Sequence, residues 1–239
     1  EVIIQKISND EKFEIKDFCS KLKIDSNFTK HPIKNKKLLI ADMDSTIIKE
    51  ETLDEIANLT NNFKEISKIT KLAMEGKISF EESLSKRIYL LKGTNIKILD
   101  KVKQNINFNS GAKELINIMN KNGAFCYLVS GGFTVFTNFV CKELNFFNNF
   151  GNKLNFYEKQ ILGDITYPII DGSQKKIIMT KLCKKHNISD TEVIAVGDGS
   201  NDLDMLKKAG MGVSFYGKEI LKKKIKYQIN FSDLTSLLY

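Results

Sequence analysis

The stretch Leu38-Leu39-Ile40-Ala41-Asp42-Met43-Asp44-Ser45-Thr46 decides how this 239-residue chain is interpreted. An apolar run ends abruptly at two aspartates that are separated by one residue, and two hydroxyl side chains follow them. A short buried strand that ends in carboxylates stabilises a core poorly, because burying an unpaired carboxylate costs several kcal/mol. We therefore expect a metal ion, loop amides or both to compensate Asp42 and Asp44, in a site suited to phosphoryl chemistry on a carboxylate nucleophile.

From residue 37 onward, strand-like and helix-like segments alternate. We expect strands at 37–41, 124–129, 193–196 and 212–215, and helices at 111–120, 133–144, 175–186 and 202–209. A strand followed by a crossover helix and a second strand is typical of a parallel sheet with helices on both faces. The sequence thus predicts an α/β fold with a Rossmann-like three-layer architecture, in which a parallel sheet lies between two layers of helices.

Residues 50–106 interrupt this alternation, because they contain helical patterns and no convincing strand. Apolar residues within 63–73 recur at helical spacing, and Ser79 with Glu82 has the pattern of a capping box at the start of a helix. This stretch is expected to form a helical cap inserted in the core. A smaller irregular stretch, 150–170, is expected to form a β-hairpin on the same side.

Three parts follow from this organisation. The catalytic core would comprise residues 37–49 and 107–239, and the cap residues 50–106. Residues 1–36 form an N-terminal segment of unreadable role, with a short amphipathic helix expected at 11–22.

Composition narrows the class of protein. The chain has 42% hydrophobic residues and no apolar run near the roughly 20 residues of a membrane span. No secretory signal is visible, although the missing initiator Met leaves room for a removed leader. The four cysteines lie far apart without metal-binding spacing, so we expect reduced thiols in a cytoplasmic protein with no membrane partner.

The net charge of +8 could indicate a nucleic-acid partner, but lysines are spread along the whole chain rather than gathered in one patch. The densest cluster, Lys222 to Lys224 with Lys226, is interpreted as a solvated helix face. We therefore expect no nucleic acid as a partner.

Polar residues follow three of the predicted strands: Asp42 with Asp44, Ser130 to Gly132, and Gly197 to Asp202. Each cluster alone also fits an ordinary turn. Because ligands of open α/β sheets bind outside the carboxyl ends of the strands, we expect all three clusters in one crevice. Their hard oxygen atoms suit Mg²⁺, and the hydroxyl with loop amides suits a phosphate.

Two cations complete the set of candidates. Lys175 would neutralise a nucleophile and a transferred phosphate, although its neighbour Lys176 offers the same chemistry. Arg87 is the only arginine of the chain. Where nearly every cation is lysine, a single arginine suggests a place that needs the two-pronged fork of a guanidinium for a carboxylate or phosphate.

These residues resemble the motifs of the haloacid dehalogenase superfamily, and within it the phosphoserine phosphatase family. The matching elements are Asp42 to Thr46, Val129 to Phe133, Lys175 and Gly197 to Asp202, in this order over residues 37–239. Spacing to the last motif favours Lys175 over Lys176. The cap stretches 50–57 and 73–84, with Arg87, resemble the part of that family that holds the amino acid.

The resemblance implies O-phospho-L-serine as substrate, Mg²⁺ as cofactor and hydrolysis through an aspartyl-phosphate, the last step of serine biosynthesis. Asp42 would be the nucleophile, and Asp44 the acid and then the base. The metal ligands would be Asp42, the backbone carbonyl of Asp44, and Asp198.

The remaining roles also come from the resemblance. Ser130, Gly131, Lys175 and Asn201 would contact the phosphate, with Asp202 orienting metal-bound water. Glu51 would contact the substrate ammonium, Arg87 its carboxylate, and Met74 with Phe80 would shield the pocket. A monomer or a homodimer is expected.

Three alternatives stay open at the level of sequence. The nearest is a related phosphatase or phosphotransferase acting on another small phosphate. A non-enzymatic phospho-acceptor module and a basic nucleic-acid-binding protein are the others, and the helical insertion and the second aspartate argue against the phospho-acceptor.

Overall fold

The computed structural model describes residues 7–29, 36–74 and 77–239, without the side chain of Met74. Its strands are β1 (Leu38–Ala41), β2 (Phe125–Phe133), β3 (Asn148–Tyr157), β4 (Gln160–Thr166), β5 (Val193–Gly197), β6 (Met211–Phe215) and β7 (Tyr227–Ile229). They form one sheet in the order β4-β3-β2-β1-β5-β6-β7. Only the β3–β4 pair is antiparallel, so the predicted parallel sheet carries one antiparallel edge strand.

The order of the parallel strands reverses at β1, because strands are added first on one side of β1 and later on the other. From β1 the chain proceeds to β2 and β3 on one side, and later returns to β5, β6 and β7 on the other. β1 is therefore flanked by β2 and β5, with Ala41 opposite Val196. In open α/β sheets the ligand crevice lies at such a switch point. Asp42 follows β1 and Asp198 follows β5, so the pairing of these two strands brings the two aspartates together.

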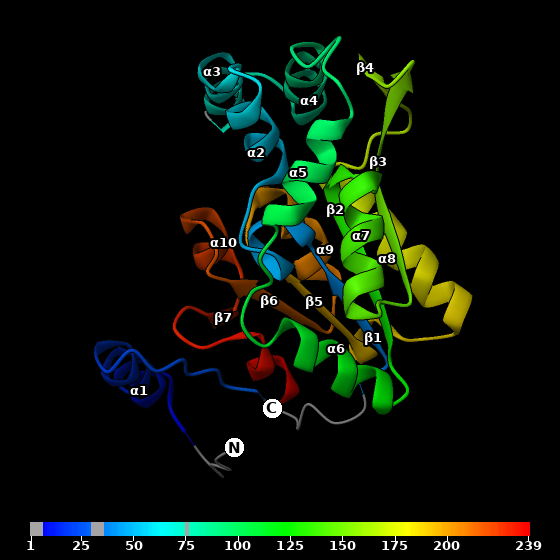
Figure 1. The fold of residues 1–239 in the computed structure, drawn as a ribbon. Coiled ribbons are helices and arrows are strands. Elements are labelled where there is room, and N and C mark those ends of the chain that lie inside the picture. Colours follow the sequence, from blue (N-terminus) through cyan, green and yellow to red (C-terminus); the bar gives the residue numbers. More distant parts are fainter. Residues whose placement is uncertain (1–6, 30–35, 75–76) are drawn as a thin grey trace.

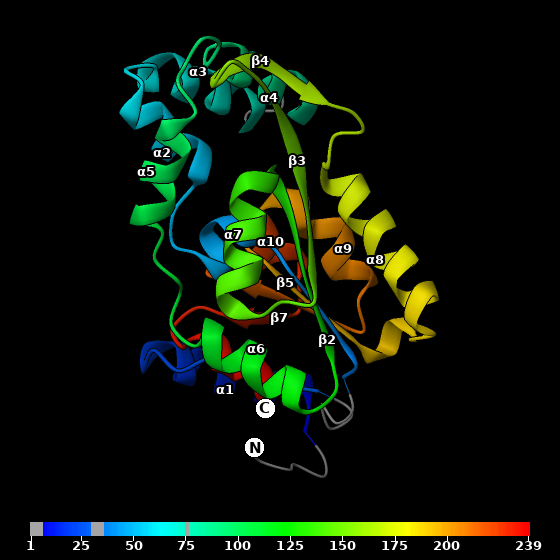
Figure 2. The same ribbon diagram turned by 45° about the vertical axis from the view of Figure 1, so that its right-hand side comes forward.

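The helices are α1 (Asn9–Lys21), α2 (Thr52–Leu59), α3 (Phe63–Met74), α4 (Phe80–Tyr89), α5 (Lys97–Asn105), α6 (Ala112–Lys121), α7 (Thr134–Leu144), α8 (Gly172–His186), α9 (Leu203–Lys208) and α10 (Glu219–Lys224). Alternate residues of β1 belong to different cores. Leu39 and Ala41 pack in the core that includes α6 and α7, whereas Leu38 and Ile40 pack in the core that includes α8, α9 and α10. Figure 2 shows α7 and α8 on opposite faces of the sheet. This alternation confirms the three-layer architecture.

The predicted helical insertion is present between β1 and β2. Helices α2 to α5 form a separate layer beyond one end of the sheet (Figure 1). The two connecting segments pair with each other through Ile48 and Phe108. We retain residues 50–106 as the proposed extent of this cap.

The expected β-hairpin is formed by β3 and β4, and it reaches the cap (Figure 1). The backbone nitrogen of Gly93 donates a 2.8 Å hydrogen bond to the carbonyl of Ile161, and the nitrogen of Ile161 donates one of 2.9 Å to Thr94. Cap and hairpin are thus joined through backbone hydrogen bonds.

Several local predictions need correction. β2 continues through Ser130 to Phe133, where a turn was expected, because this segment still pairs with β3 after a register shift between Val129 and Phe133. β7 was not predicted, since it is a three-residue edge strand beside the lysine-rich α10. Of the capping box predicted at Ser79 and Glu82, the structure shows the first half: the Ser79 hydroxyl accepts from the backbone nitrogen of Glu82 at the start of α4, whereas the Glu82 carboxylate accepts from Lys86.

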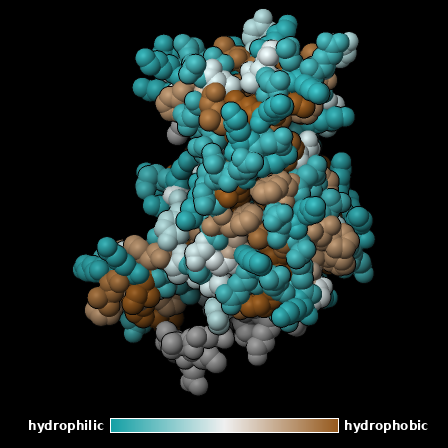
Figure 3. Space-filling model, viewed as in Figure 1, coloured by the Kyte–Doolittle hydropathy of each residue, from teal (hydrophilic) through white to brown (hydrophobic). Residues whose placement is uncertain are grey.

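The N-terminal helix α1 extends from Asn9 to Lys21, close to the predicted 11–22, and none of its residues is buried. Phe13 and Phe18 are mostly exposed on it, and Figure 3 shows this apolar surface at the lower left. After α1, the carboxylate of Asp25 accepts hydrogen bonds from the backbone of Asn230 and Ser232. Within the described residues, no helix is both long and apolar enough to span a membrane.

Candidate active site

Asp42 directly follows β1 at the switch point of the sheet. Its backbone nitrogen continues the sheet with a 3.0 Å hydrogen bond to the carbonyl of Val196. Its side chain is buried, and Oδ1 accepts a 2.8 Å hydrogen bond from the backbone nitrogen of Met43. The strand end therefore fixes the direction of this carboxylate.

Lys175 in α8 connects two of the predicted motifs. Its ammonium lies 2.7 Å from Asp42 Oδ1 and 2.7 Å from Asp202 Oδ1, and it is fully buried. Burial alone would lower the pKa of Lys175, but the carboxylates of Asp202 and Asp42 outweigh burial and raise it. Lys176 is exposed. The structure therefore places Lys175, and not its neighbour, at the carboxylates.

Three buried carboxylates, those of Asp42, Asp198 and Asp202, form a group in which one ligand atom from each lies within 4.8 Å of the others. Burial, followed by repulsion from Asp42, raises the pKa of Asp202 to about 7 and also raises that of Asp198. The hard oxygen atoms of such clustered carboxylates fit a divalent cation such as Mg²⁺. The chemistry of these residues thus suits the metal that the resemblance implies.

Asp44 and the glycine-containing segment of β2 lie against each other. A Cβ at Gly132 would lie 2.8 Å from Asp44 Oδ2 and 3.1 Å from Ser130 Oγ, so only glycine allows this approach. Asp44 Oδ1 accepts a hydrogen bond of 3.1 Å from the backbone nitrogen of Thr52. Burial, then repulsion from Glu51 and Asp42, raises the pKa of Asp44 well above its ordinary value. A carboxyl group of this kind can hold a proton for delivery.

The β2 segment at the site is held by a residue that sequence reasoning missed. The Asn152 side chain in β3 donates a 2.8 Å hydrogen bond to the carbonyl of Gly131 and accepts one of 2.7 Å from the nitrogen of Ile170. Ser130 is buried, and its hydroxyl accepts from the nitrogen of Gly132 at 2.9 Å. Nothing in the local sequence marks Asn152, since its role depends on the pairing of β3 with β2.

Glu51 at the start of the cap is joined to the core motif. Ser45 Oγ donates a 2.8 Å hydrogen bond to Glu51 Oε1, and Ser45 adopts a left-handed backbone conformation with φ of 54°. Partial desolvation by the surrounding protein raises the pKa of Glu51, and the nearby carboxylates of Asp198 and Asp42 raise it further. A cation placed beside Glu51 would relieve this repulsion.

Arg87 in α4 is half-buried. Its Nε donates to the carbonyl of Ser83 in the preceding turn at 3.3 Å. Burial lowers its pKa, whereas the carboxylates of Asp54 and Glu51 raise it. The lone arginine is therefore within electrostatic reach of Asp54 and, more weakly, of Glu51, the carboxylate that the resemblance assigns to the substrate ammonium.

The other predicted contacts lie as follows. Phe80 at the start of α4 reaches the core, since a Cβ at Gly131 would lie 3.0 Å from Phe80 Cζ. Asn201 lies in the short 3₁₀ turn Ser200–Asp202 after β5. The side chain of Met74 lies outside the described residues, so its predicted shielding role is not described.

Lys218 is a second residue that sequence reasoning missed. Its ammonium lies 3.3 Å from Asp198 Oδ2, just before α10. The rule that located the other residues could have indicated it, because Lys218 follows the expected strand at 212–215. Its lysine-rich surroundings concealed it.

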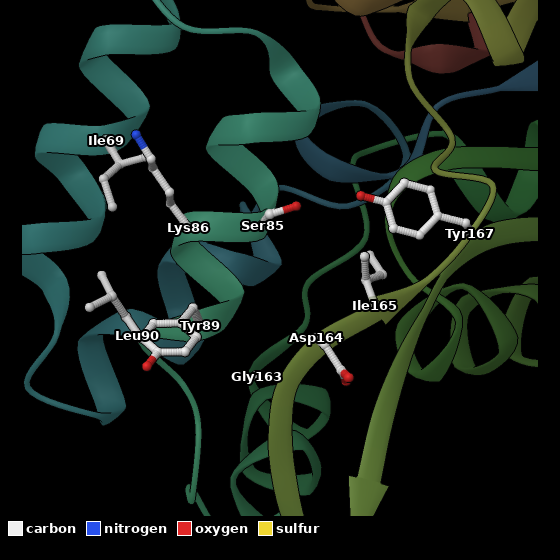
Figure 4. A pocket seen from close by; sticks show the side chains of 9 residues that line it. All are labelled: Ile69, Ser85, Lys86, Tyr89, Leu90, Gly163, Asp164, Ile165 and Tyr167. Atoms are coloured by element: carbon white, nitrogen blue, oxygen red, sulfur yellow. The ribbon is translucent and has the colours of Figure 1, made fainter.

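A cavity of about 550 Å³ lies between the cap and the hairpin (Figure 4). Its walls include Ser85 and Tyr89 of α4 and Ile165 of β4, with Tyr167 beyond that strand. None of the predicted catalytic or metal-binding residues lines it. This cavity is therefore distinct from the carboxylate cluster.

The profile of the haloacid dehalogenase-like hydrolase family matches residues 36–210. The chain belongs to the haloacid dehalogenase-like hydrolase family. All four predicted motifs of this hydrolase lie inside the matched range, whereas Lys218 lies beyond it.

Similar proteins refine this assignment. A phosphoserine phosphatase from Archaeoglobus fulgidus is 39% identical over 204 residues, which are 85% of this chain but 59% of that protein. One from Methanocaldococcus jannaschii is 39% identical over 205 residues, 86% of this chain and 97% of that protein. A solved structure of a phospho-aspartyl intermediate analogue of phosphoserine phosphatase has a TM-score of 0.80 and 39% identity, covering 86% of this chain and 98% of that chain. The hydrolase therefore resembles the phosphoserine phosphatase from Methanocaldococcus jannaschii and the solved phosphoserine phosphatase over nearly their whole length, and the Archaeoglobus fulgidus protein over 59% of its length.

Proposed function

We propose that this chain is a phosphoserine phosphatase that hydrolyses O-phospho-L-serine to L-serine and phosphate. The observation that carries the proposal is that Glu51 of the cap lies within electrostatic reach of the core carboxylates Asp42 and Asp198 and also of Arg87. On the core side, the Asp42 carboxylate forms an ion pair with the Lys175 ammonium. On the cap side, Glu51 and Arg87 present the opposite charges that a zwitterionic amino acid requires. Relatives named phosphoserine phosphatase support the same substrate.

The first half-reaction follows from the core residues. A carboxylate oxygen of Asp42 forms a bond to phosphorus while the bond between phosphorus and the serine oxygen breaks. Asp44, whose raised pKa favours the protonated form, donates its proton to the departing serine oxygen. Lys175 keeps the nucleophile in place and stabilises charge on the phosphoryl oxygens, together with Ser130 and the amides around it.

The second half-reaction reverses the role of Asp44. As a carboxylate it removes a proton from water, whose oxygen bonds to phosphorus, and the aspartyl-phosphate breaks to restore Asp42. Asp44 thus serves both halves of the reaction: it loses its proton in the first half and regains one in the second.

The metal in this proposal is Mg²⁺, which Asp42, Asp198 and the backbone carbonyl of Asp44 would hold; Asp202 belongs to the same group of carboxylates as Asp42 and Asp198. When bound, it supplies positive charge that offsets repulsion between an anionic nucleophile and a dianionic phosphate. Lys175 occupies Asp42 Oδ1 and Asp202 Oδ1, so it holds two carboxylates of the cluster in fixed positions.

In the cap, Glu51 would bind the substrate ammonium and Arg87 its carboxylate. Phe80, which reaches Gly131, would cover the phosphate side of the pocket. Closure of the cap would exclude bulk water from the aspartyl-phosphate until the amino acid has left.

Release of phosphate from O-phospho-L-serine, measured with and without Mg²⁺, tests the proposal. We expect turnover that requires the metal and that exceeds turnover of phosphate esters lacking the ammonium or the carboxylate. Equal turnover of such esters would favour a general small-molecule phosphatase. Formation of new phosphate esters with added alcohols would favour a phosphotransferase.

We further propose a cytoplasmic enzyme, monomeric or homodimeric. All four cysteines are free, and Cys126 and Cys183 are buried, which suits a reducing compartment. Light scattering during size-exclusion chromatography distinguishes the two oligomeric states.

A further inference from the structure

Lys218 lies where it can act on the metal site, although it lies outside the four motifs and outside the stretch matched to the family. Its ammonium lies 3.3 Å from Oδ2 of Asp198. The Asp198 side chain is 9% exposed and that of Lys218 is 54% exposed, so the pair joins a nearly buried anion to a half-exposed cation. Such a half-exposed pair contributes little to global stability. We therefore ask what Lys218 does to Asp198, its ion-pair partner.

The backbone is shaped to bring Lys218 to this position. β6 ends at Phe215, Tyr216 takes a left-handed conformation with φ of 44°, and Gly217 follows. A side chain at Gly217 would collide with the Ser214 hydroxyl. This tight turn lets the nitrogen of Lys218 donate a 2.9 Å hydrogen bond to the carbonyl of Asp198. The two residues are thus fixed to each other through the main chain before their side chains meet.

The three carboxylates of the cluster differ in what holds them. Asp42 accepts from Met43 and Lys175, and Asp202 accepts from Gly199 and Lys175. Within the described part of the chain, Lys218 provides the one ion pair or hydrogen bond recorded for the Asp198 carboxylate. Lys218 therefore does for Asp198 what Lys175 does for the other two.

We propose that Lys218 is a positioning residue that orients Asp198 for metal binding. Carboxylates that bind metals depend on such outer hydrogen-bonding partners for their orientation. Lys218 is also within electrostatic reach of Glu51, the proposed ammonium site of the cap. This inference rests on the metal site of the proposed function, but not on the identity of the substrate.

The test measures Mg²⁺ affinity of the whole chain without substrate, from the increase in the free energy of unfolding with Mg²⁺ concentration. Lys218→Met should weaken Mg²⁺ binding by about 10- to 100-fold, the usual loss when an outer partner of a metal ligand is removed. Lys218→Arg should restore much of the affinity, since it keeps a charged donor. Lys222→Met, one turn further along α10 and paired with the exposed Glu219, should bind Mg²⁺ like the wild type.

The direction of change separates positioning from simple charge. If Lys218 acted only as a repelling cation, its removal would tighten Mg²⁺ binding. Tighter or unchanged binding in Lys218→Met would therefore overturn the proposal, as would an equal loss in Lys222→Met. Absence of Mg²⁺ binding by the wild type would instead contradict the proposed metal site itself.

Discussion

The Lys175 ammonium lies 2.7 Å from Asp42 Oδ1 and equally close to Asp202 Oδ1, in a fully buried position. One cation thus neutralises charge on two carboxylates that come from opposite sides of the switch point. If one partner of a buried ion pair is replaced by an uncharged residue, the other partner remains as an uncompensated charge in the protein interior.

Lys175→Met should therefore destabilise the protein by about 3–5 kcal/mol. Urea unfolding at mildly alkaline pH without Mg²⁺ measures this free energy. Lys176→Met is the matched control, because Lys176 is exposed on the same helix, and its effect should stay within about 0.5 kcal/mol. Similar losses in both variants would contradict the buried pair.

The raised pKa of Asp44 predicts how stability depends on pH. Its ordinary value is 3.8, and the folded protein raises it, so the folded state binds the proton more tightly than the unfolded chain. Stability of the metal-free protein should then rise as the pH falls through the raised pKa toward 3.8, and decline again as the pH rises.

Asp44→Asn removes this titration and keeps the shape of the side chain. Thermal unfolding across the pH range should show a higher melting temperature than the wild type at alkaline pH and a flatter pH dependence. The same variant should lose turnover, because an amide neither donates nor accepts the catalytic proton. An unchanged pH profile of stability would refute the raised pKa.

Arg87→Lys tests the amino-acid end of the pocket. A lysine cannot form the two-pronged contact with a carboxylate, so kcat/KM for phosphoserine should fall by about 10- to 100-fold, the loss of a charged hydrogen bond. Phosphoethanolamine, which lacks the carboxylate, is the matched substrate and should be turned over by both proteins at similar, low rates. A parallel decline with both substrates would mean that Arg87 supports the cap rather than the carboxylate.

Gly132→Ala tests the close approach of β2 to the catalytic acid. The added methyl group would lie 2.8 Å from Asp44 Oδ2, so this carboxyl group must shift. A displacement of about 1 Å at a reacting group can cost about 10²-fold in rate. Steady-state kinetics should show this loss in kcat, with thermal unfolding changed much less. Normal kcat would show that the carboxyl group has room to move.

Much of this site could be predicted because strand ends in a parallel sheet converge. Asp42, Ser130 and Asp198 each lie at or near the end of an apolar run, and the pattern alone indicated one crevice. The choice between Lys175 and Lys176 rested on the resemblance, through the spacing to the last motif. The helix offers a second reason, because Lys175 shares the buried face of α8 with Met179 and Leu182. This face is visible as an i, i+4, i+7 spacing.

Other residues could not be found in this way, for physical reasons. Asn152 acts through the pairing of β3 with β2, a contact between distant segments that no local pattern encodes. Lys218 is a different case: it follows the expected strand at 212–215, so the same rule could have indicated it, but its lysine-rich surroundings concealed it. The tight turn that brings it to Asp198 is defined only by the tertiary structure. β7 is too short to show strand periodicity, so the last parallel strand was missed.

The most direct test of the central claim is to trap the phosphoenzyme. Turnover of labelled phosphoserine, stopped with acid, should leave an acid-stable and base-labile phosphoryl group on the peptide that contains Asp42. Asp42→Asn should lose this label and reduce turnover by roughly 10⁴-fold or more, as expected for a nucleophile. Label on another residue, or substantial turnover by Asp42→Asn, would contradict Asp42 as the nucleophile.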